Sequence, residues 1–173
     1  MLKRFIPFAH AESIYKIDLS FYKKLGIKYV FVDLDNTLDS YKQATPLEPA
    51  KKLKENLEKE GIELIIVSNN RGKRVQKYSK DLGVKHWSTL GKPFAIRITK
   101  IMKRLGINKD EVIMIGDQIV TDISCANGAK IKSVLTEKLV PEDQPTTRFN
   151  RLFDNPLRRK LKRKNLLKDW RQI

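Results

Sequence analysis

The chain has 173 residues, of which 40% are hydrophobic and 32% are charged. This balance is too apolar for a disordered chain and too polar for a membrane-spanning one, and the length is typical of a single domain. No apolar run approaches the roughly 18 residues that a spanning helix needs. The amino terminus has basic residues but lacks the apolar stretch and cleavage site of a secretory signal.

Basic residues dominate the charge of the chain. Thirty-six lysines and arginines against 20 acidic residues leave a net charge of +16, and residues 148–173 alone hold ten basic and two acidic residues. Nucleic acid, an anionic membrane surface and a phosphorylated substrate are the partners that such a charge favours. The single cysteine, Cys125, excludes an internal disulfide framework and is typical of a reducing compartment, so we expect a cytoplasmic protein.

The first 25 residues hold an apolar, aromatic start and a short predicted helix. From there, runs typical of buried strands alternate with apolar residues at helical spacing. The strand-like runs cover residues 28–33, 62–67, 85–88, 111–115 and 132–135. The helical spacing follows Pro49, then runs from Val75 to Leu82 and from Ile98 to Leu105. This alternation predicts an α/β fold of three layers, Rossmann-like, with a parallel sheet of about five strands.

Glycines mark the ends of the predicted helices, because glycine readily takes the left-handed conformation that closes a helix. The glycines in these positions are Gly26, Gly61, Gly83, Gly106 and Gly128. We divide the chain into an N-terminal apolar and helical extension (1–25), a core (26–147) and a basic C-terminal segment (148–173). For the last segment, a helix that begins at Asn155-Pro156 and a solvated basic stretch are both open.

Two carboxylates follow the first predicted core strand, in the segment Asp33-Leu-Asp35-Asn-Thr37. Ligands bind at the carboxyl ends of parallel strands, and two carboxylates there can converge on one cation. The Thr37 hydroxyl is placed to fix the turn. A polar turn capped by an aspartate side chain is the structural alternative.

Polar residues follow the second strand as well. Ser68-Asn69-Asn70 ends it just before a helix, where a hydroxyl and backbone N–H groups form a natural phosphate site. Lys92 precedes the fourth helix and can bring a positive charge to the same edge of the sheet. Taken singly, these features are also typical of a helix cap and of an exposed lysine.

Asp117 and Asp122 follow the strand at residues 111–115. Asp117 can complete a magnesium site, and Asp122 can orient a lysine or a metal-bound water. A capped helix start is the alternative. The four segments occur in order along the chain, and together they indicate phosphoryl transfer, in which an anionic group is held by cations and attacked in line.

These four segments resemble the motifs of the haloacid dehalogenase (HAD) superfamily of phosphatases. More narrowly, they resemble the YqeG branch of its subclass IIIA, which is similar to the mitochondrial phosphatidylglycerophosphate phosphatases. The resemblance covers about residues 20–151 and includes the segment Thr147-Arg-Phe-Asn-Arg151. It implies a HAD fold and a phosphatase that works through an aspartyl-phosphate.

The resemblance also implies a role for each motif residue. Asp33 is the nucleophile, and Asp35 protonates the leaving oxygen and then activates water. Lys92 neutralises charge on the phosphoryl group, and the residues implied in substrate binding are Thr37, Ser68, Asn69 and Asn70. Mg²⁺ is the implied cofactor, with ligands from Asp33, the Asp35 carbonyl and Asp117, and with Asp122 as a water-mediated partner.

The spacing of the motifs leaves no room for a cap domain. Asp33 and Ser68 are 35 residues apart, Ser68 and Lys92 are 24 apart, and helices and strands fill both intervals. We therefore expect an open site that suits a large substrate or one presented on a surface. The basic charge and the resemblance favour hydrolysis of phosphatidylglycerophosphate at an anionic membrane surface, with the protein peripherally attached.

Alternatives remain open at this stage. A polynucleotide-end or other macromolecular phosphatase would use the basic tail on nucleic acid, and a non-enzymatic RNA- or ribosome-binding protein would keep the fold as a scaffold. The apolar N-terminal residues enter a membrane interface or pack against the domain; these are Leu2, Phe5, Ile6 and Phe8. The sequence does not give the oligomeric state.

Overall fold

The fold is that of a computed structural model, which describes residues 2–70, 72–142 and 145–173, the last without the side chains of residues 145–148. In the described residues, six parallel strands form one sheet in the order β1-β6-β5-β2-β3-β4. The strands are β1 (Ala9–Ala11), β2 (Tyr29–Val32), β3 (Glu63–Val67), β4 (Lys85–Trp87), β5 (Val112–Gly116) and β6 (Lys132–Thr136).

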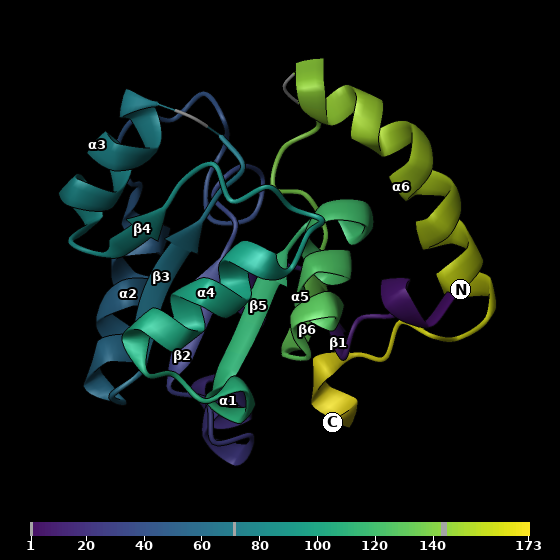
Figure 1. Cartoon of the computed structure of the whole chain (residues 1–173), viewed down its shortest axis with the longest axis horizontal. Helices are drawn as coiled ribbons and strands as arrows, with labels where there is room; N and C mark the ends of the chain where they lie inside the picture. The colour runs from purple at the N-terminus through teal and green to yellow at the C-terminus, as the bar shows by residue number, and fades with distance from the viewer. Residues whose placement is uncertain (1, 71, 143–144) are drawn as a thin grey trace.

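Helices connect the strands, and Figure 1 shows them around the sheet. The α-helices are α1 (Leu19–Lys24), α2 (Glu48–Lys59), α3 (Lys73–Leu82), α4 (Ile96–Leu105), α5 (Ser124–Ala129) and α6 (Pro145–Arg163). Shorter turns are η1 (Leu2–Phe5), η2 (Ile14–Lys16), η3 (Lys109–Glu111), the π-helical η4 (Ile119–Ile123) and η5 (Trp170–Gln172). None of the described helices combines the length and apolarity needed to cross a bilayer.

The sheet is buried on both faces, which accounts for the continuous apolar runs of its strands. Successive residues of β2 point to opposite sides: Val30 and Val32 pack with α1, α2 and α3, whereas Phe31 packs with α4 and α5. The predicted three-layer α/β/α architecture is confirmed. The five predicted strands are all present, each with bounds within one residue of those expected.

The sixth strand, β1, was not predicted. It is only three residues long, and its sequence Ala-His-Ala has little preference for extended structure. Its place in the sheet comes from pairing with β6, where Ala9 lies opposite Val134 and Ala11 opposite Thr136. Part of the N-terminal extension is therefore an edge strand of the sheet.

Four of the five glycines do take the left-handed conformation. The prediction for Gly128 is wrong, because Gly128 lies inside α5 and Lys130 closes that helix with a φ of 59°. A Cβ at Gly128 would lie 3.1 Å from the Cβ of Ala95. This glycine therefore allows α5 to approach the start of α4 closely.

Both ends of the chain pack against the sheet. Leu2, Phe5 and Ile6 pack on a buried cluster formed by Ile119, Ile123, Leu135 and Leu161, and Phe8 packs against the main core. Helix α6 runs along the right-hand side of Figure 1, beside the N-terminal segment. Of the two possibilities left open for the N-terminal apolar residues, packing against the domain is the one observed.

Helix α6 begins at Pro145, well before the Asn155-Pro156 start considered from the sequence. The division drawn at residues 147/148 therefore falls inside a helix, and the side chains of Thr147 and Arg148 lie outside the described residues. Pro156 cannot donate the backbone hydrogen bond to the Leu152 carbonyl, but both residues are exposed, so water can satisfy that carbonyl. The helix therefore continues through Pro156.

Candidate active site

Polar side chains surround a pocket at the carboxyl ends of β2, β3 and β5. The pocket has a volume of about 220 Å³. Its lining residues are Asp33, Asp35, Ser68, Asn69, Asn70, Lys92, Gln118, Thr121 and Asn150. Six of the sequence-predicted site residues thus meet at one edge of the sheet, as the right-handed crossovers require.

Lys92 is at the centre of the site. Its Nζ lies 2.6 Å from Asp33 Oδ1, 2.6 Å from Asp122 Oδ1 and 3.1 Å from the Val67 carbonyl oxygen, and its side chain is 2% exposed. Burial lowers the pKa of Lys92, but the carboxylates of Asp122 and Asp33 outweigh this and raise it above its usual value. The buried ammonium is therefore a permanent positive charge in the pocket.

The backbone of Lys92 is held by Asn69. The Asn69 amide donates to the Lys92 carbonyl oxygen at 2.9 Å, and the Lys92 N–H donates to Asn69 Oδ1 at 2.8 Å. Asn69 was predicted to bind substrate, and the structure adds this second role. The pair of bonds fixes where the lysine enters the pocket.

Asp35 has a different set of partners. Arg74 Nη2 lies 2.6 Å from Asp35 Oδ1, and the Asn70 amide donates to Asp35 Oδ2. The Asn70 N–H in turn donates to Ser68 Oγ at 3.1 Å. Burial raises the pKa of Asp35, while Arg74 acts in the opposite direction. A carboxyl group with a raised pKa is suited to give and take a proton.

Three buried carboxylates form a cluster that could hold a metal ion. One ligand oxygen from each of Asp33, Asp117 and Asp122 lies within 4.8 Å of the others. Thr37 donates its hydroxyl to Asp117 Oδ1 at 3.3 Å, so it contacts this cluster rather than the pocket lining. The Asp35 carboxylate is outside the cluster and is held by Arg74, which leaves the Asp35 carbonyl as the group of this residue predicted to contact the metal.

The electrostatics of the cluster fit a divalent cation. Burial raises the pKa of Asp33, against the effect of Lys92, and raises that of Asp117 to about 6, against the effect of Arg151. Crowded, desolvated carboxylates need positive charge, and carboxylate oxygens are the ligands that Mg²⁺ prefers. Gly116 permits the arrangement, because a Cβ there would overlap the Asp122 side chain.

Helix α6 supplies a second wall of the site, which the motif analysis missed. The Asn150 amide donates to Gln118 Oε1 at 3.2 Å. The Arg151 guanidinium pairs with the Asp117 carboxylate and also donates to the Asp117 carbonyl oxygen at 3.1 Å. Asp154 accepts the Val120 N–H at 2.8 Å. These contacts fix the loop that carries Asp117.

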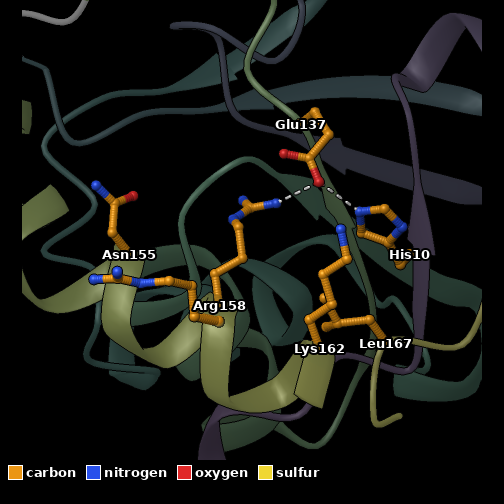
Figure 2. A pocket seen from close by; sticks show the side chains of 7 residues that line it. His10, Glu137, Asn155, Arg158, Lys162 and Leu167 are labelled. Atoms are coloured by element: carbon orange, nitrogen blue, oxygen red, sulfur yellow. Dashed lines mark hydrogen bonds and ion pairs between the residues drawn. The ribbon is translucent and has the colours of Figure 1, made fainter. Parts of the chain in front are cut away.

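Arg158 continues this wall away from the pocket. Its Nη2 donates to the carbonyl oxygens of Asp117 at 2.8 Å and Thr136 at 3.1 Å, and its Nη1 lies 2.9 Å from Glu137. Glu137 is also 2.9 Å from His10 Nε2 on β1. Figure 2 shows the contacts of Glu137 with Arg158 and His10, three residues that line a larger pocket of about 710 Å³.

The missed residues leave little trace in the sequence. Arg74 does give one signal, because a cation in the first turn of α3 opposes the helix dipole and so suggests a specific partner. Asn150 and Arg151 were noted only within the segment of family resemblance. Nothing in their spacing places them opposite Asp117.

A family model described as haloacid dehalogenase-like hydrolase matches residues 2–136. The chain belongs to this family. The family resemblance found in the sequence is thereby confirmed, as is the HAD type of fold. Together with a relative named as a phosphatase that is 30% identical over nearly the whole chain, the match also shows that the chain is an enzyme, a HAD-type phosphatase.

Two curated proteins are similar to this chain in sequence. The chain is 30% identical over 165 residues to a Bacillus subtilis (strain 168) protein named "Probable phosphatase YqeG", covering 95% of this chain and 96% of that protein. It is 28% identical over 152 residues to phosphatidylglycerophosphate phosphatase 1, chloroplastic/mitochondrial, of Arabidopsis thaliana. That match covers 81% of this chain but 43% of the plant protein.

Solved structures agree on the fold. An uncharacterized protein from Listeria monocytogenes serotype 4b superposes on this HAD-type phosphatase with a TM-score of 0.53 and 17% identity. The superposition covers 69% of this chain and 88% of that one.

Proposed function

We propose that this HAD-type phosphatase is a magnesium-dependent phosphomonoesterase that converts phosphatidylglycerophosphate to phosphatidylglycerol at an anionic membrane surface. One observation supports this chemistry above all. The carboxylates of Asp33 and Asp35, which follow β2, line the same pocket but pair with different cationic side chains. Lys92 lies against Asp33, and Arg74 lies against Asp35. Two chemically identical carboxyl groups in different environments can take different roles, one as the nucleophile and one as the acid and base.

In the first step, an Asp33 oxygen attacks the phosphorus atom and the bond from phosphorus to the leaving oxygen breaks. An aspartyl-phosphate forms, and Asp35 gives its proton to the leaving alkoxide. Lys92 provides positive charge beside the phosphoryl oxygens in a desolvated pocket, where that charge acts strongly. The Ser68 hydroxyl, which also lines the pocket, is placed for the same oxygens.

In the second step, the ionised Asp35 takes a proton from water as that water attacks the phosphorus atom. The bond between phosphorus and Asp33 breaks, which releases inorganic phosphate and restores both carboxyl groups to their initial states. The raised pKa of Asp35 favours the protonated form needed first, and Arg74 limits the rise so that the ionised form remains accessible.

The metal site proposed for Mg²⁺ comprises Asp33, Asp117 and Asp122. When bound there, the ion would reduce the repulsion between the anionic nucleophile and the anionic phosphate. Arg151 and Thr37 hold Asp117 in place from two sides.

Three features support the lipid substrate. The first is the similarity to the plant phosphatidylglycerophosphate phosphatase. The second is that, among the described residues, the intervals between Asp33, Ser68 and Lys92 hold α2, β3, α3 and β4 and no further domain that would cover the site. The third is the net charge of +16, which favours an anionic surface.

The decisive experiment measures Mg²⁺-dependent phosphate release from phosphatidylglycerophosphate in anionic vesicles. We expect release by the wild type and by Asp110→Asn, a control at an exposed site, and none by Asp33→Asn. Activity on an aryl phosphate without release from the lipid would contradict the substrate and turn the search to nucleic-acid ends. Equal activity of Asp33→Asn would contradict the mechanism.

A further inference from the structure

Three large apolar side chains are exposed together on the outer face of α6. Phe149 is 64% exposed, Leu152 67% and Phe153 56%, and the two rings contact each other edge to face with centroids 5.7 Å apart. Residues three and four positions apart share one face of a helix, so these side chains form one patch. Exposed apolar side chains are common singly, whereas a cluster on one face marks a contact surface.

The same face of α6 becomes basic toward its C-terminal end. Lys160 and Arg163 continue the stripe that Phe149 and Phe153 begin, Arg159 flanks it, and Lys164 follows directly after the helix, all of them exposed. No carboxylate of a described residue pairs with these four cations. The one acidic residue between positions 149 and 164, Asp154, is buried on the opposite face. The outer face is therefore apolar at one end and cationic at the other.

The inner face fixes this surface relative to the active site. Arg151, Asp154 and Arg158 hold α6 against the loop that carries Asp117. Asn150, between Phe149 and Arg151 in the chain, lines the catalytic pocket. A surface that contacts Phe149 therefore lies next to a residue of the catalytic pocket.

We infer that the outer face of α6 docks the enzyme on an anionic lipid bilayer. Phe149, Leu152 and Phe153 enter the interface, and the cations that follow contact the phosphate groups of the lipids. The inference rests on the proposed function, because this face would hold the enzyme on the membrane that contains its lipid substrate. An anionic bilayer matches both halves of the surface, and three side chains are few for a protein partner of ordinary interface size.

The N-terminal apolar residues do not compete for this role. Leu2, Phe5 and Ile6 pack against the cluster that includes Leu161 on the inner face of α6. They support the helix from inside, which leaves its outer face to meet the membrane.

The test is co-sedimentation of the full chain with vesicles of phosphatidylcholine containing 30% phosphatidylglycerol. The variant Phe149→Ser/Leu152→Ser/Phe153→Ser should bind about 100-fold more weakly, because each inserted side chain adds several-fold to partitioning. Its activity on an aryl phosphate should stay within about twofold of wild type, which shows that the fold is intact. Leu47→Ser, a control at an exposed leucine outside α6, should bind as the wild type does.

The charge of the surface is tested separately. Lys160→Gln/Arg163→Gln should weaken binding by about fivefold per charge on the anionic vesicles and have no effect on pure phosphatidylcholine. Wild-type binding by the triple serine variant would overturn the inference. So would a wild-type dimer in sedimentation velocity that the triple variant converts to a monomer, because the patch would then be an interface between copies of the chain.

The outcome is distinguishable from that of the proposed function. Vesicle binding that depends on the α6 patch, without phosphate release from phosphatidylglycerophosphate, would uphold the docking face and reject the substrate. Phosphate release from the lipid that the triple variant retains in full would uphold the substrate and reject the docking face.

Discussion

The catalytic site has two walls of different origin. One wall consists of residues at strand ends, among them Asp33 after β2 and Asp117 after β5, whose positions follow from the sheet. The other consists of Asn150 and Arg151 on α6, which reach the site only because that helix packs against η4. The difference suggests that the strand-end wall holds the reacting groups and that the α6 wall holds those groups in place.

Lys92→Met tests the strand-end wall and should have the largest effect. It removes the cation shared by Asp33 and Asp122, so we expect kcat to fall by about 10³-fold. The free energy of unfolding of the metal-free protein should fall by about 3 kcal/mol, since two buried carboxylates lose their partner. Urea denaturation at neutral pH measures this loss, and added Mg²⁺ should recover part of it. A variant with wild-type kcat would contradict the role of Lys92.

Arg151→Met tests the α6 wall. It leaves the Asp117 carboxylate without its paired guanidinium, so we expect the metal-free protein to lose about 2–3 kcal/mol in urea denaturation. Activity at saturating Mg²⁺ should fall less than tenfold, because Arg151 positions Asp117 and does not react. Lys162→Met, at an exposed site on the same helix outside the docking face, is the control. A loss of activity as large as that of Lys92→Met would contradict the idea that the α6 wall only positions the reacting groups.

Arg74→Met tests whether the two carboxylates of β2 are divided by their cations. Arg74 opposes the rise in the pKa of Asp35, so its removal should raise that pKa further. The ionised form of Asp35 would then be lost at a higher pH, and the acidic limb of the kcat profile should move to higher pH. Arg74→Lys, which keeps the charge, should move it less. An unchanged profile would mean that Asp35 is not the group that titrates.

Glu137→Gln probes the outer end of the α6 wall, and its effect should be the smallest. The hydrogen bond from His10 and the charge of Arg158 lower the pKa of Glu137 in the folded state (Figure 2). A lowered pKa stabilises the fold above the unfolded value of about 4.5, and this contribution is lost as the pH falls through the folded value. The variant should therefore be less stable than wild type at pH 7, by under about 1 kcal/mol, and equal to it under acid conditions.

The site residues at strand ends could be predicted from the sequence, because the carboxyl ends of all strands in a parallel sheet lie at the same edge. The run before Asp33 and the run before Asp117 identify two neighbouring strands, and ligand sites lie at their carboxyl ends. No such rule relates Arg151 to Asp117, because α6 lies at the side of the sheet and its register depends on packing around Leu161. Long-range packing likewise decides the pairing of β1, whose three residues carry no strand signal of their own.

Burial was equally hard to predict for apolar residues near the ends of the chain. Phe5 and Phe149 have similar sequence surroundings, since each directly follows an arginine. Phe5 packs against the buried cluster beneath α6, whereas Phe149 is exposed on its outer face. Hydropathy describes a side chain, but its environment depends on which side of a helix the rest of the fold covers.

The edge strand β1 has a consequence for how the chain folds during synthesis. The His10 N–H donates to the Lys168 carbonyl oxygen at 2.7 Å, and Trp170 packs edge to face against Phe21. Residues made before most of the sheet thus complete their contacts only with residues made after all six strands. On the ribosome, the sheet has an open edge until Lys168 has left the exit tunnel, and that edge must be kept from pairing with other chains in the meantime.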